Sequence, residues 1–258
     1  DLVGWENYSK LFRIRAWDTA VTNLLIFGSL YIVICCALGL TLAILLDQKI
    51  RAEGFIRTIY LYPMALSFIV TGTVWKWILN PGLGIERFMR EAGWENFTFD
   101  WLVNSDYAIY TLVIAAVWQS SGYAMALFLA GLRSVDDEIL KAAAVDGASP
   151  WKTYTSIVLP ILRPVFLSTV IILAHLAIKS FDLVIALTGG GPGYATDMPA
   201  TFMYSFAFQR SELGVAAASA TMMPITTSSS TNVNPEWNGR RLYKEVRSIG
   251  LRILQLIS

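Results

Sequence analysis

Four runs of apolar residues constrain the fold of this chain more than any other feature of its sequence. They cover residues 20–46, 56–79, 107–132 and 165–187. A helix needs about 20 apolar residues to cross the hydrocarbon core of a bilayer, and inside that core every backbone polar group must be satisfied within the protein. The sequence therefore predicts an all-α integral membrane protein that folds as a polytopic helical bundle.

A fifth apolar run is shorter than the other four. It begins at Leu213 and reads LGVAAASATMM before Pro224 and a tract rich in Ser and Thr. With a rise of about 1.5 Å per residue, this run covers roughly half of the core. We therefore expect about five transmembrane segments, of which the last is incomplete, in a membrane domain over residues 1–223.

Residues 224–258 form an atypical polar and basic tail. We expect a linker over residues 224–235, followed by a stretch in which Arg240, Arg241 and Lys244 precede several apolar residues. Two interpretations of this stretch stay open: an amphipathic helix on the membrane surface, or a segment unrelated to the rest of the protein.

The composition excludes several classes of function. The chain is 55% hydrophobic and only 15% charged, with a net charge of +1, so nothing in its composition favours binding to nucleic acid. Cys35 and Cys36 are neighbours, a spacing that does not form an ordinary disulfide. These two Cys and the single His of the chain do not make up a metal site. We therefore expect membrane lipid around the protein, and no metal, cofactor or nucleic acid.

The Lys and Arg residues of the connecting segments set the predicted orientation. Residues 47–57 and 133–163 are rich in them, whereas residues 80–106 and 188–212 are poorer. Since cytoplasmic loops carry an excess of Lys and Arg, the first two segments are predicted to lie in the cytoplasm.

Residues 133–163 contain the most regular polar pattern of the chain, KAAAVDGASPWKTYTSIVLP from residue 141. Ser134 or Asp136 can cap a helix, Gly147 can end it with a left-handed residue, and Pro150 can begin the next one. The pattern predicts two short helices with a sharp turn between them. It leaves open whether they only cover helix ends or dock another protein.

This segment resembles the EAA loop of the integral-membrane subunits of bacterial ABC importers, whose pattern is E-A-A-x3-G-x9-I-x-L-P. The residues at matching spacing are Ala142, Ala143, Gly147, Ile157, Leu159 and Pro160. Lys141 stands where the family has Glu, so the resemblance assigns no acidic role at that position.

The resemblance extends over about residues 1–223. The stretches TNLLIF at 22–27, GFIRTIYLYP at 54–63, the pattern W-x3-G-Y-A at 118–124 and FDLVIALTGGGPGYAT at 181–196 are similar to carbohydrate-importer permeases of the maltose, glycerol-phosphate and glucose types. Members of that family have a further span before the position where this chain begins. The resemblance therefore implies a permease domain without its first helix.

The resemblance also implies a function and partners. The chain would be a multi-pass permease subunit of the bacterial cytoplasmic (inner) membrane that forms half of a sugar pathway. Its partners would be a second homologous permease, two ABC ATPase subunits and a periplasmic or lipid-anchored sugar-binding protein. The implied ATPase-coupling residues lie in and after the 137–150 loop: Ile139, Leu140, Lys141, Ala142, Ala143, Asp146, Gly147, Ala148, Ile157, Leu159 and Pro160.

No residue pattern supplies catalysis. The sequence TGGGPG at 188–193 has no following Lys and reads as a turn rather than a phosphate loop, so ATP hydrolysis is expected on a partner. Polar and aromatic residues inside the spans are candidates for the substrate pathway: Gln119, Tyr123, Lys179, Phe181 and Asp182. The same residues could instead form interhelical hydrogen bonds or a structural ion pair between Lys179 and Asp182.

Two rival functions stay open. A secondary transporter would need acidic coupling sites and internal repeats near the middle of the membrane, and the sequence offers only Asp182. A truncated, non-functional membrane paralogue is the second rival, because the last span is half-length.

Overall fold

The computed structural model describes residues 5–48 and 53–231, and this part of the chain is helical between its turns. The α-helices are α1 (Glu6–Leu11), α2 (Arg15–Asp47), α3 (Glu53–Leu61), α4 (Phe68–Ile78), α5 (Ile85–Glu91), α6 (Ala108–Leu132), α7 (Asp137–Val145), α8 (Pro150–Thr153), α9 (Leu159–Ile161), α10 (Arg163–Ile178), α11 (Phe181–Leu187), α12 (Pro199–Tyr204) and α13 (Leu213–Thr231). Three short turns complete the path: a 3-10 turn at Tyr62–Ala65 and π-helical turns at Tyr154–Val158 and Ser205–Gln209.

Two helices, α2 and α6, are each long and apolar enough to cross a membrane. Two bent pairs bring the number to as many as four: Glu53–Ala65 with Phe68–Ile78, and Trp151–Ile161 with Arg163–Ile178. The apolar part of α13, Leu213–Met223, is shorter. The predicted all-α membrane bundle is confirmed, with two to four candidate spans and one shorter apolar helix in the part of the chain that the structure describes.

Two of the predicted runs are not single straight helices. The run at 56–79 bends by 99° after Ala65, where Pro63 lies in the 3-10 turn and the Ser67 hydroxyl accepts a hydrogen bond from the Val70 amide (3.3 Å) to begin α4. The run at 165–187 breaks between α10 and α11. Hydropathy reports compatibility with lipid and carries no information on such bends.

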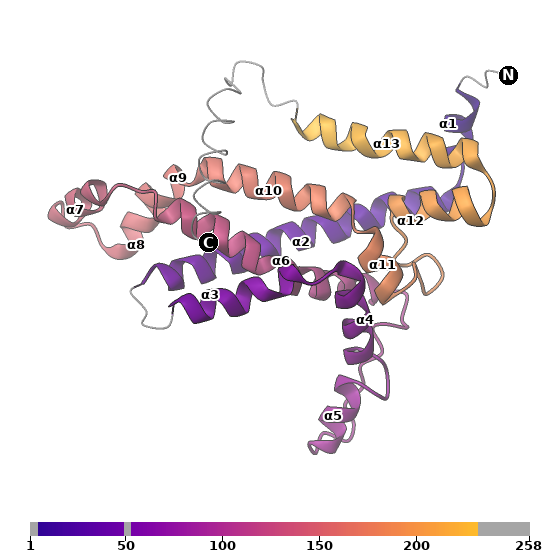
Figure 1. Cartoon of the computed structure of the whole chain (residues 1–258), viewed down its shortest axis with the longest axis horizontal. Helices are drawn as coiled ribbons and strands as arrows, with labels where there is room; N and C mark the ends of the chain where they lie inside the picture. The colour runs from indigo at the N-terminus through magenta and orange to yellow at the C-terminus, as the bar shows by residue number, and fades with distance from the viewer. Residues whose placement is uncertain (1–4, 49–52, 232–258) are drawn as a thin grey trace.

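Helix α6 is the centre of the bundle. Most of its residues are buried, and α2 lies along it over much of its length (Figure 1). Side chains from α2, α6 and α10 form two apolar clusters, one around Phe27, Tyr31 and Leu112, the other around Phe128 and Leu162. Because these clusters join three elements that are far apart in sequence, they fix how the two ends of the bundle are arranged.

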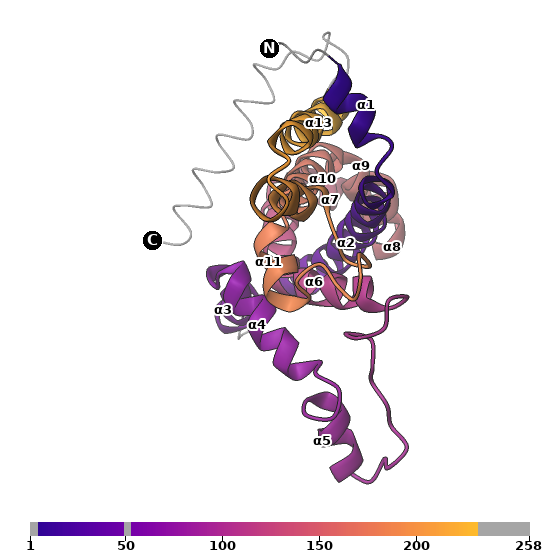
Figure 2. The same ribbon diagram turned by 90° about the vertical axis from the view of Figure 1, so that its right-hand side faces the viewer.

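The two ends of the bundle differ. Helices α7 and α8 and the start of α3 lie at one end, whereas α4, α5 and α11 lie toward the other, and α5 projects away from the bundle (Figures 1 and 2). An ion pair of 2.8 Å between Arg133 and Glu53 ties the start of α3 to the end of α6. The two basic segments of the sequence therefore meet at one end, which we call the basic end.

The last helix is longer than predicted. We expected a linker from residue 224, but α13 continues through Pro224 to Thr231, so the linker prediction is wrong for residues 224–231. Membrane helices tolerate proline, and a drop in hydropathy does not by itself end a helix. The rest of the predicted tail, from residue 232, lies outside the described residues.

Candidate functional site

Helix α7 begins at the basic end with a capped N-terminus. The Asp136 carboxylate accepts a hydrogen bond from the Glu138 amide (2.9 Å), and the carboxylates of Asp137 and Glu138 lie in the first turn, where the helix dipole favours negative charge. The predicted cap is confirmed.

A sharp turn follows α7. Gly147 has a φ of +73°, and the amides of Gly147 and Ala148 donate to the carbonyls of Ala144 and Ala143 at 3.1 and 3.0 Å, which is a helix ending by a left-handed residue. The Ser149 hydroxyl then accepts from the Lys152 amide (3.3 Å) at the start of α8. The predicted pair of short helices is therefore confirmed; we call α7, the turn and α8 the α7–α8 segment.

The tip of the α7–α8 segment exposes large apolar side chains. Val145 is 88% exposed and Trp151 is 78% exposed, while Ala143 between the segment and the bundle is 5% exposed. Exposed apolar side chains on a segment outside the membrane spans can mark an interaction site, and these two lie on either side of the turn at Gly147. Val145 and Trp151 were not selected as functional residues from the sequence. Their apolar character within a polar segment was the signal that could have identified them.

The sequence-predicted coupling residues divide between the tip and the base of the segment. Ile139, Lys141, Ala142, Asp146 and Gly147 are exposed. The remaining predicted residues are partly or fully buried against the bundle: Leu140, Ala143, Ala148, Ile157, Leu159 and Pro160. Within the described residues, no ion pair holds Lys141, so its ammonium group faces solvent.

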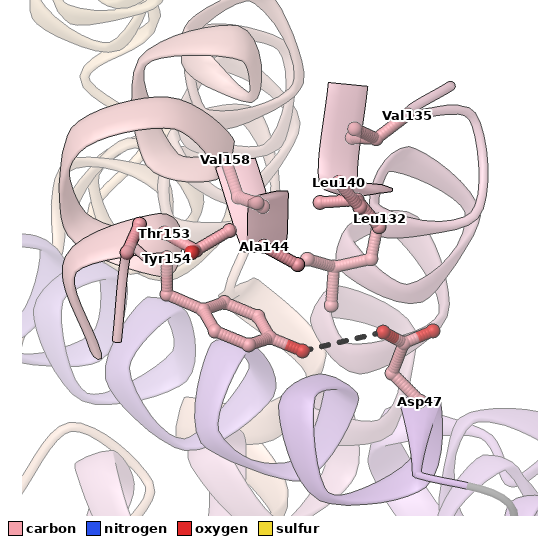
Figure 3. A pocket seen from close by; sticks show the side chains of 9 residues that line it. Asp47, Leu132, Val135, Leu140, Ala144, Thr153, Tyr154 and Val158 are labelled. Carbon is pink, nitrogen blue, oxygen red and sulfur yellow. Dashed lines mark hydrogen bonds between the residues drawn. The ribbon is translucent and has the colours of Figure 1, made fainter. Parts of the chain in front are cut away.

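A pocket of about 260 Å³ separates the segment from the bundle. Its walls are mainly apolar, and Figure 3 shows the Tyr154 ring on one side and Asp47 below it. The lining residues are Asp47, Leu132, Val135, Leu140, Ala144, Ala148, Thr153, Tyr154 and Val158.

Polar groups lie at the edge of this pocket. The Tyr154 hydroxyl donates to an Asp47 carboxylate oxygen at 3.4 Å. The Arg133 guanidinium lies 3.9 Å from Asp47 and 2.8 Å from Glu53, and Arg57 also pairs with Glu53. Ion pairs therefore link the end of α2, the start of α3 and the end of α6. A hydrogen bond links Asp47 of this group to the π-helical turn after α8.

Two of the predicted pathway residues lie on α6. Gln119 is 3% exposed, and its Nε2 donates to the Leu66 carbonyl (2.8 Å) at the bend before α4. The Oε1 of Gln119 is buried without a hydrogen-bond partner among the described residues, and Tyr123 is half-buried. The predicted hydrogen bonding between helical segments is therefore confirmed for the Nε2 atom of Gln119.

The other three predicted pathway residues lie around the break between α10 and α11. Lys179 caps the end of α10, Asp182 lies in the first turn of α11, and both are exposed. The break separates their side chains, and they form no ion pair with each other, so the predicted pair is wrong. Phe181 packs on Tyr204, with ring centroids 5.3 Å apart. None of the five pathway candidates lines the pocket at the α7–α8 segment.

The glycine-rich turn after α11 is held at the end opposite α7. Asn23 donates to the carbonyls of Tyr194 and Asp197, both at 3.0 Å, and the hydroxyls of Thr188 and Thr196 lie 2.7 Å apart. Burial raises the pKa of the Asp197 carboxyl, against hydrogen bonds from the Thr201 hydroxyl and the Met198 amide and the charge of Arg210. This turn is an anchored structural element.

Comparison with known proteins gives a family match over most of the chain. Residues 35–231 match the family model described as "Binding-protein-dependent transport system inner membrane component". A probable ABC transporter permease protein of Pyrococcus horikoshii is 39% identical over 222 residues, 86% of this chain and 76% of the relative. The xylose/arabinose import permease protein of Haloferax volcanii is 40% identical over 221 residues, 85% of this chain and 69% of the relative.

A solved structure shares the fold. The crystal structure of a bacterial ABC transporter involved in the import of the acidic polysaccharide alginate aligns with a TM-score of 0.79 at 20% identity, covering 92% of this chain and 85% of that chain. At this identity the likeness concerns the fold alone. The family match runs from within α2 to the end of α13 and includes the whole α7–α8 segment.

Proposed function

Because the chain belongs to the family of binding-protein-dependent transport system inner membrane components, it is a multi-pass permease subunit of an ABC transporter, and we propose that it imports a sugar and couples to its ATPase through residues 137–150. ATP hydrolysis takes place on a separate subunit. The observation that carries the coupling proposal is the α7–α8 segment, whose rigid turn holds Val145 and Trp151 out into solvent at the basic end.

The α7–α8 segment has the features of a docking element. Its N-terminus is capped, and its turn is closed by backbone hydrogen bonds. Two large apolar side chains, Val145 and Trp151, are exposed near the turn. Interfaces take most of their binding energy from a few large side chains that fill pockets on the partner. Trp151 is suited to that role in a groove of the ATPase, and Val145 adds exposed apolar surface on the same segment, on the cytoplasmic side that the Lys and Arg distribution predicts.

The sugar assignment has two supports. The Haloferax volcanii relative is a xylose/arabinose import permease, and the stretches at 22–27, 54–63 and 181–196 resemble sugar-importer permeases. The transporter acts with a binding protein, and we propose that two permease subunits form the pathway above two ATPases. Closing of the ATPases then shifts the pathway between inward-facing and outward-facing states.

The five pathway candidates keep a proposed role in sugar passage. Gln119 has the clearest argument, because its buried Oε1 lacks a partner and buried polar atoms are normally satisfied. A state of the pathway in which the bend before α4 opens would expose this oxygen to a sugar hydroxyl, which can donate to it. Tyr123 and Phe181 are half-buried rings, and Lys179 and Asp182 expose charges at the α10–α11 break; these four rest on their position in the spans.

Replacing Val145 with aspartate tests the docking role. The change places a charge on an apolar tip that must lose water on docking, and burial of an unpaired charge is strongly unfavourable. We expect co-purification of the ATPase with a tagged permease to fall about tenfold. The measurement is quantitative pull-down from membranes that contain the complete transporter.

The matched control is Val103→Asp, which makes the same change at a residue that is 59% exposed and lies between α5 and α6, away from the basic end. This variant is expected to retain the ATPase. Equal recovery of the ATPase with both variants would contradict the docking role of the tip.

A further inference from the structure

We propose that Arg133 and Tyr154, which precede and follow the α7–α8 segment in the chain, are positioning residues that fasten its two ends to Asp47 at the end of α2, so that movement of the segment is passed to the central helices. This inference rests on the proposed coupling function and names the contacts through which the coupling reaches the bundle. Neither residue is among those that the resemblance assigns to coupling.

Tyr154 reaches across from the segment to α2. It lies directly after α8, and its hydroxyl donates to the carboxylate of Asp47, the last residue of α2. The two residues are 107 positions apart in sequence, so no chain connection carries this contact. Figure 3 shows the ring of Tyr154 pointing from the segment toward the Asp47 side chain.

Arg133 approaches the same carboxylate from α6. It caps the end of α6, and it lies 3.9 Å from Asp47 and 2.8 Å from Glu53, the first residue of α3. A cation at the end of one helix and an anion at the start of another are both favoured by the helix dipoles. Arg133 therefore joins three helix ends directly beside the point where the chain enters α7.

The position of Asp47 is unfavourable for α2 alone. It lies in the last turn of the helix, where the dipole disfavours negative charge, and that turn contains no basic residue. The charge is compensated from outside the helix, by Arg133 and the hydroxyl of Tyr154. Asp47 is thus placed where it serves contacts between elements rather than the stability of its own helix.

The pocket explains why these polar contacts matter for movement. Close-packed interiors transmit displacement because side chains interdigitate without voids, but a space of about 260 Å³ lies between Leu140 and Ala144 of α7 and the bundle. A displacement of α7 can be absorbed by closing of this space, without a matching movement of the bundle. Asp47 and Tyr154 both line that space, and their contact, together with that between Asp47 and Arg133, links the two ends of the segment to α2.

These contacts are not needed to hold the fold. The side chains of Asp47 and Arg133 are 28% and 41% exposed, and ion pairs with this exposure add little to stability. Their removal should therefore leave a folded permease in which the α7–α8 segment stays packed on the bundle through apolar contacts but follows the movement of α2 less closely.

The test measures the number of ATP molecules hydrolysed per sugar imported by the complete transporter in proteoliposomes, with radiolabelled xylose, arabinose and maltose as probes. Tyr154→Phe removes the hydroxyl and keeps the ring that lines the pocket; Arg133→Gln removes the charge. Each is expected to raise the ATP-to-sugar ratio about fivefold, the effect of one lost hydrogen bond or charged contact. Arg133→Lys retains a cation and is expected to keep the ratio close to the native value.

A second measurement needs no substrate. Amide hydrogen exchange of the full chain in lipid nanodiscs should be about fivefold faster in the last turn of α2 and in α8 when Tyr154 is replaced by Phe. The control is Arg87→Gln, which breaks the exposed Arg87–Glu91 ion pair (2.7 Å) on α5 and should change neither exchange at the basic end nor the ATP-to-sugar ratio.

Unchanged exchange in Tyr154→Phe would overturn the inference, as would an ATP-to-sugar ratio that stays native in both Tyr154→Phe and Arg133→Gln. Equal impairment by Arg133→Lys and Arg133→Gln would also count against it, since a cation should suffice. If the native transporter imports none of the three sugars, the sugar assignment fails, while the exchange measurement still decides the role of Tyr154.

Discussion

Replacing Gly147 with valine is expected to reduce sugar uptake about tenfold while the ATPase continues to hydrolyse ATP. A tenfold loss corresponds to about 1.4 kcal/mol of destabilisation of the correctly formed turn. Gly147 has a φ of +73°, and a Cβ added there would meet nothing within 4 Å. The cost is therefore backbone strain and not a clash. A left-handed conformation costs an L-residue about 1–2 kcal/mol, and β-branched residues tolerate it least. The turn would relax and aim α7 and α8 differently at the ATPase.

Two variants isolate the turn as the cause. Gly147→Asn should retain uptake, because asparagine accepts left-handed backbone at little cost. Gly82→Val introduces the same strain at a φ of +77° with equally open surroundings, but in the turn after α4, and should leave coupling intact. Native uptake by Gly147→Val in correctly inserted protein would contradict the proposed role of residues 137–150.

Replacing Gly122 with alanine is expected to lower the stability of the whole bundle by about 1–3 kcal/mol, the usual cost of overpacking a tight contact. A Cβ at Gly122 of α6 would lie 1.8 Å from the carbonyl oxygen of Tyr60 and 2.5 Å from its carbon. Backbone atoms cannot rotate away, so α3 must move off α6. Small residues at helix contacts in membranes allow this kind of close approach.

The measurement is the thermal midpoint of the detergent-purified protein, followed by size-exclusion fluorescence, in which Gly122→Ala should lose several degrees. Gly54→Ala is the matched control: it adds the same methyl group to α3, where nothing lies within 4 Å, and should be neutral. Equal midpoints for the two variants would show that α3 does not contact α6 as closely as the structure places it.

The sequence predicted most of the architecture because bilayer-length apolar runs permit few alternatives. It did not predict the 99° bend after Ala65, since Pro63 and Ser67 mark a local turn without giving its angle. It was also wrong at Pro224, where α13 continues to Thr231. Both differences concern backbone direction inside segments whose hydropathy was read correctly.

The α7–α8 segment was predictable because its signals are local. A cap at Asp136, a left-handed Gly147 and a helix start at Pro150 each act within a few residues. The contact of Tyr154 with Asp47 spans 107 positions, so no periodic pattern could pair them. The prediction of an ion pair between Lys179 and Asp182 was wrong for a related reason. It assumed that both residues lie on one continuous helix, but the helix breaks between them.

A secondary transporter would run without ATP, so ATP-dependent uptake separates it from the proposed importer. A non-functional permease would show no uptake but would still bind its partners if the α7–α8 segment is intact. The family match over residues 35–231 places the chain with the ABC permeases, and the remaining question is where the ATPase contacts it.

A photo-crosslinking amino acid at position 145 answers that question most directly. In membranes that contain the complete transporter, the proposed coupling site predicts an adduct between the permease and its ATPase subunit, because Val145 is the most exposed apolar side chain of the α7–α8 segment. The same probe at position 103 should give no such adduct. An adduct from position 145 only with lipid or with the second permease would contradict the coupling site.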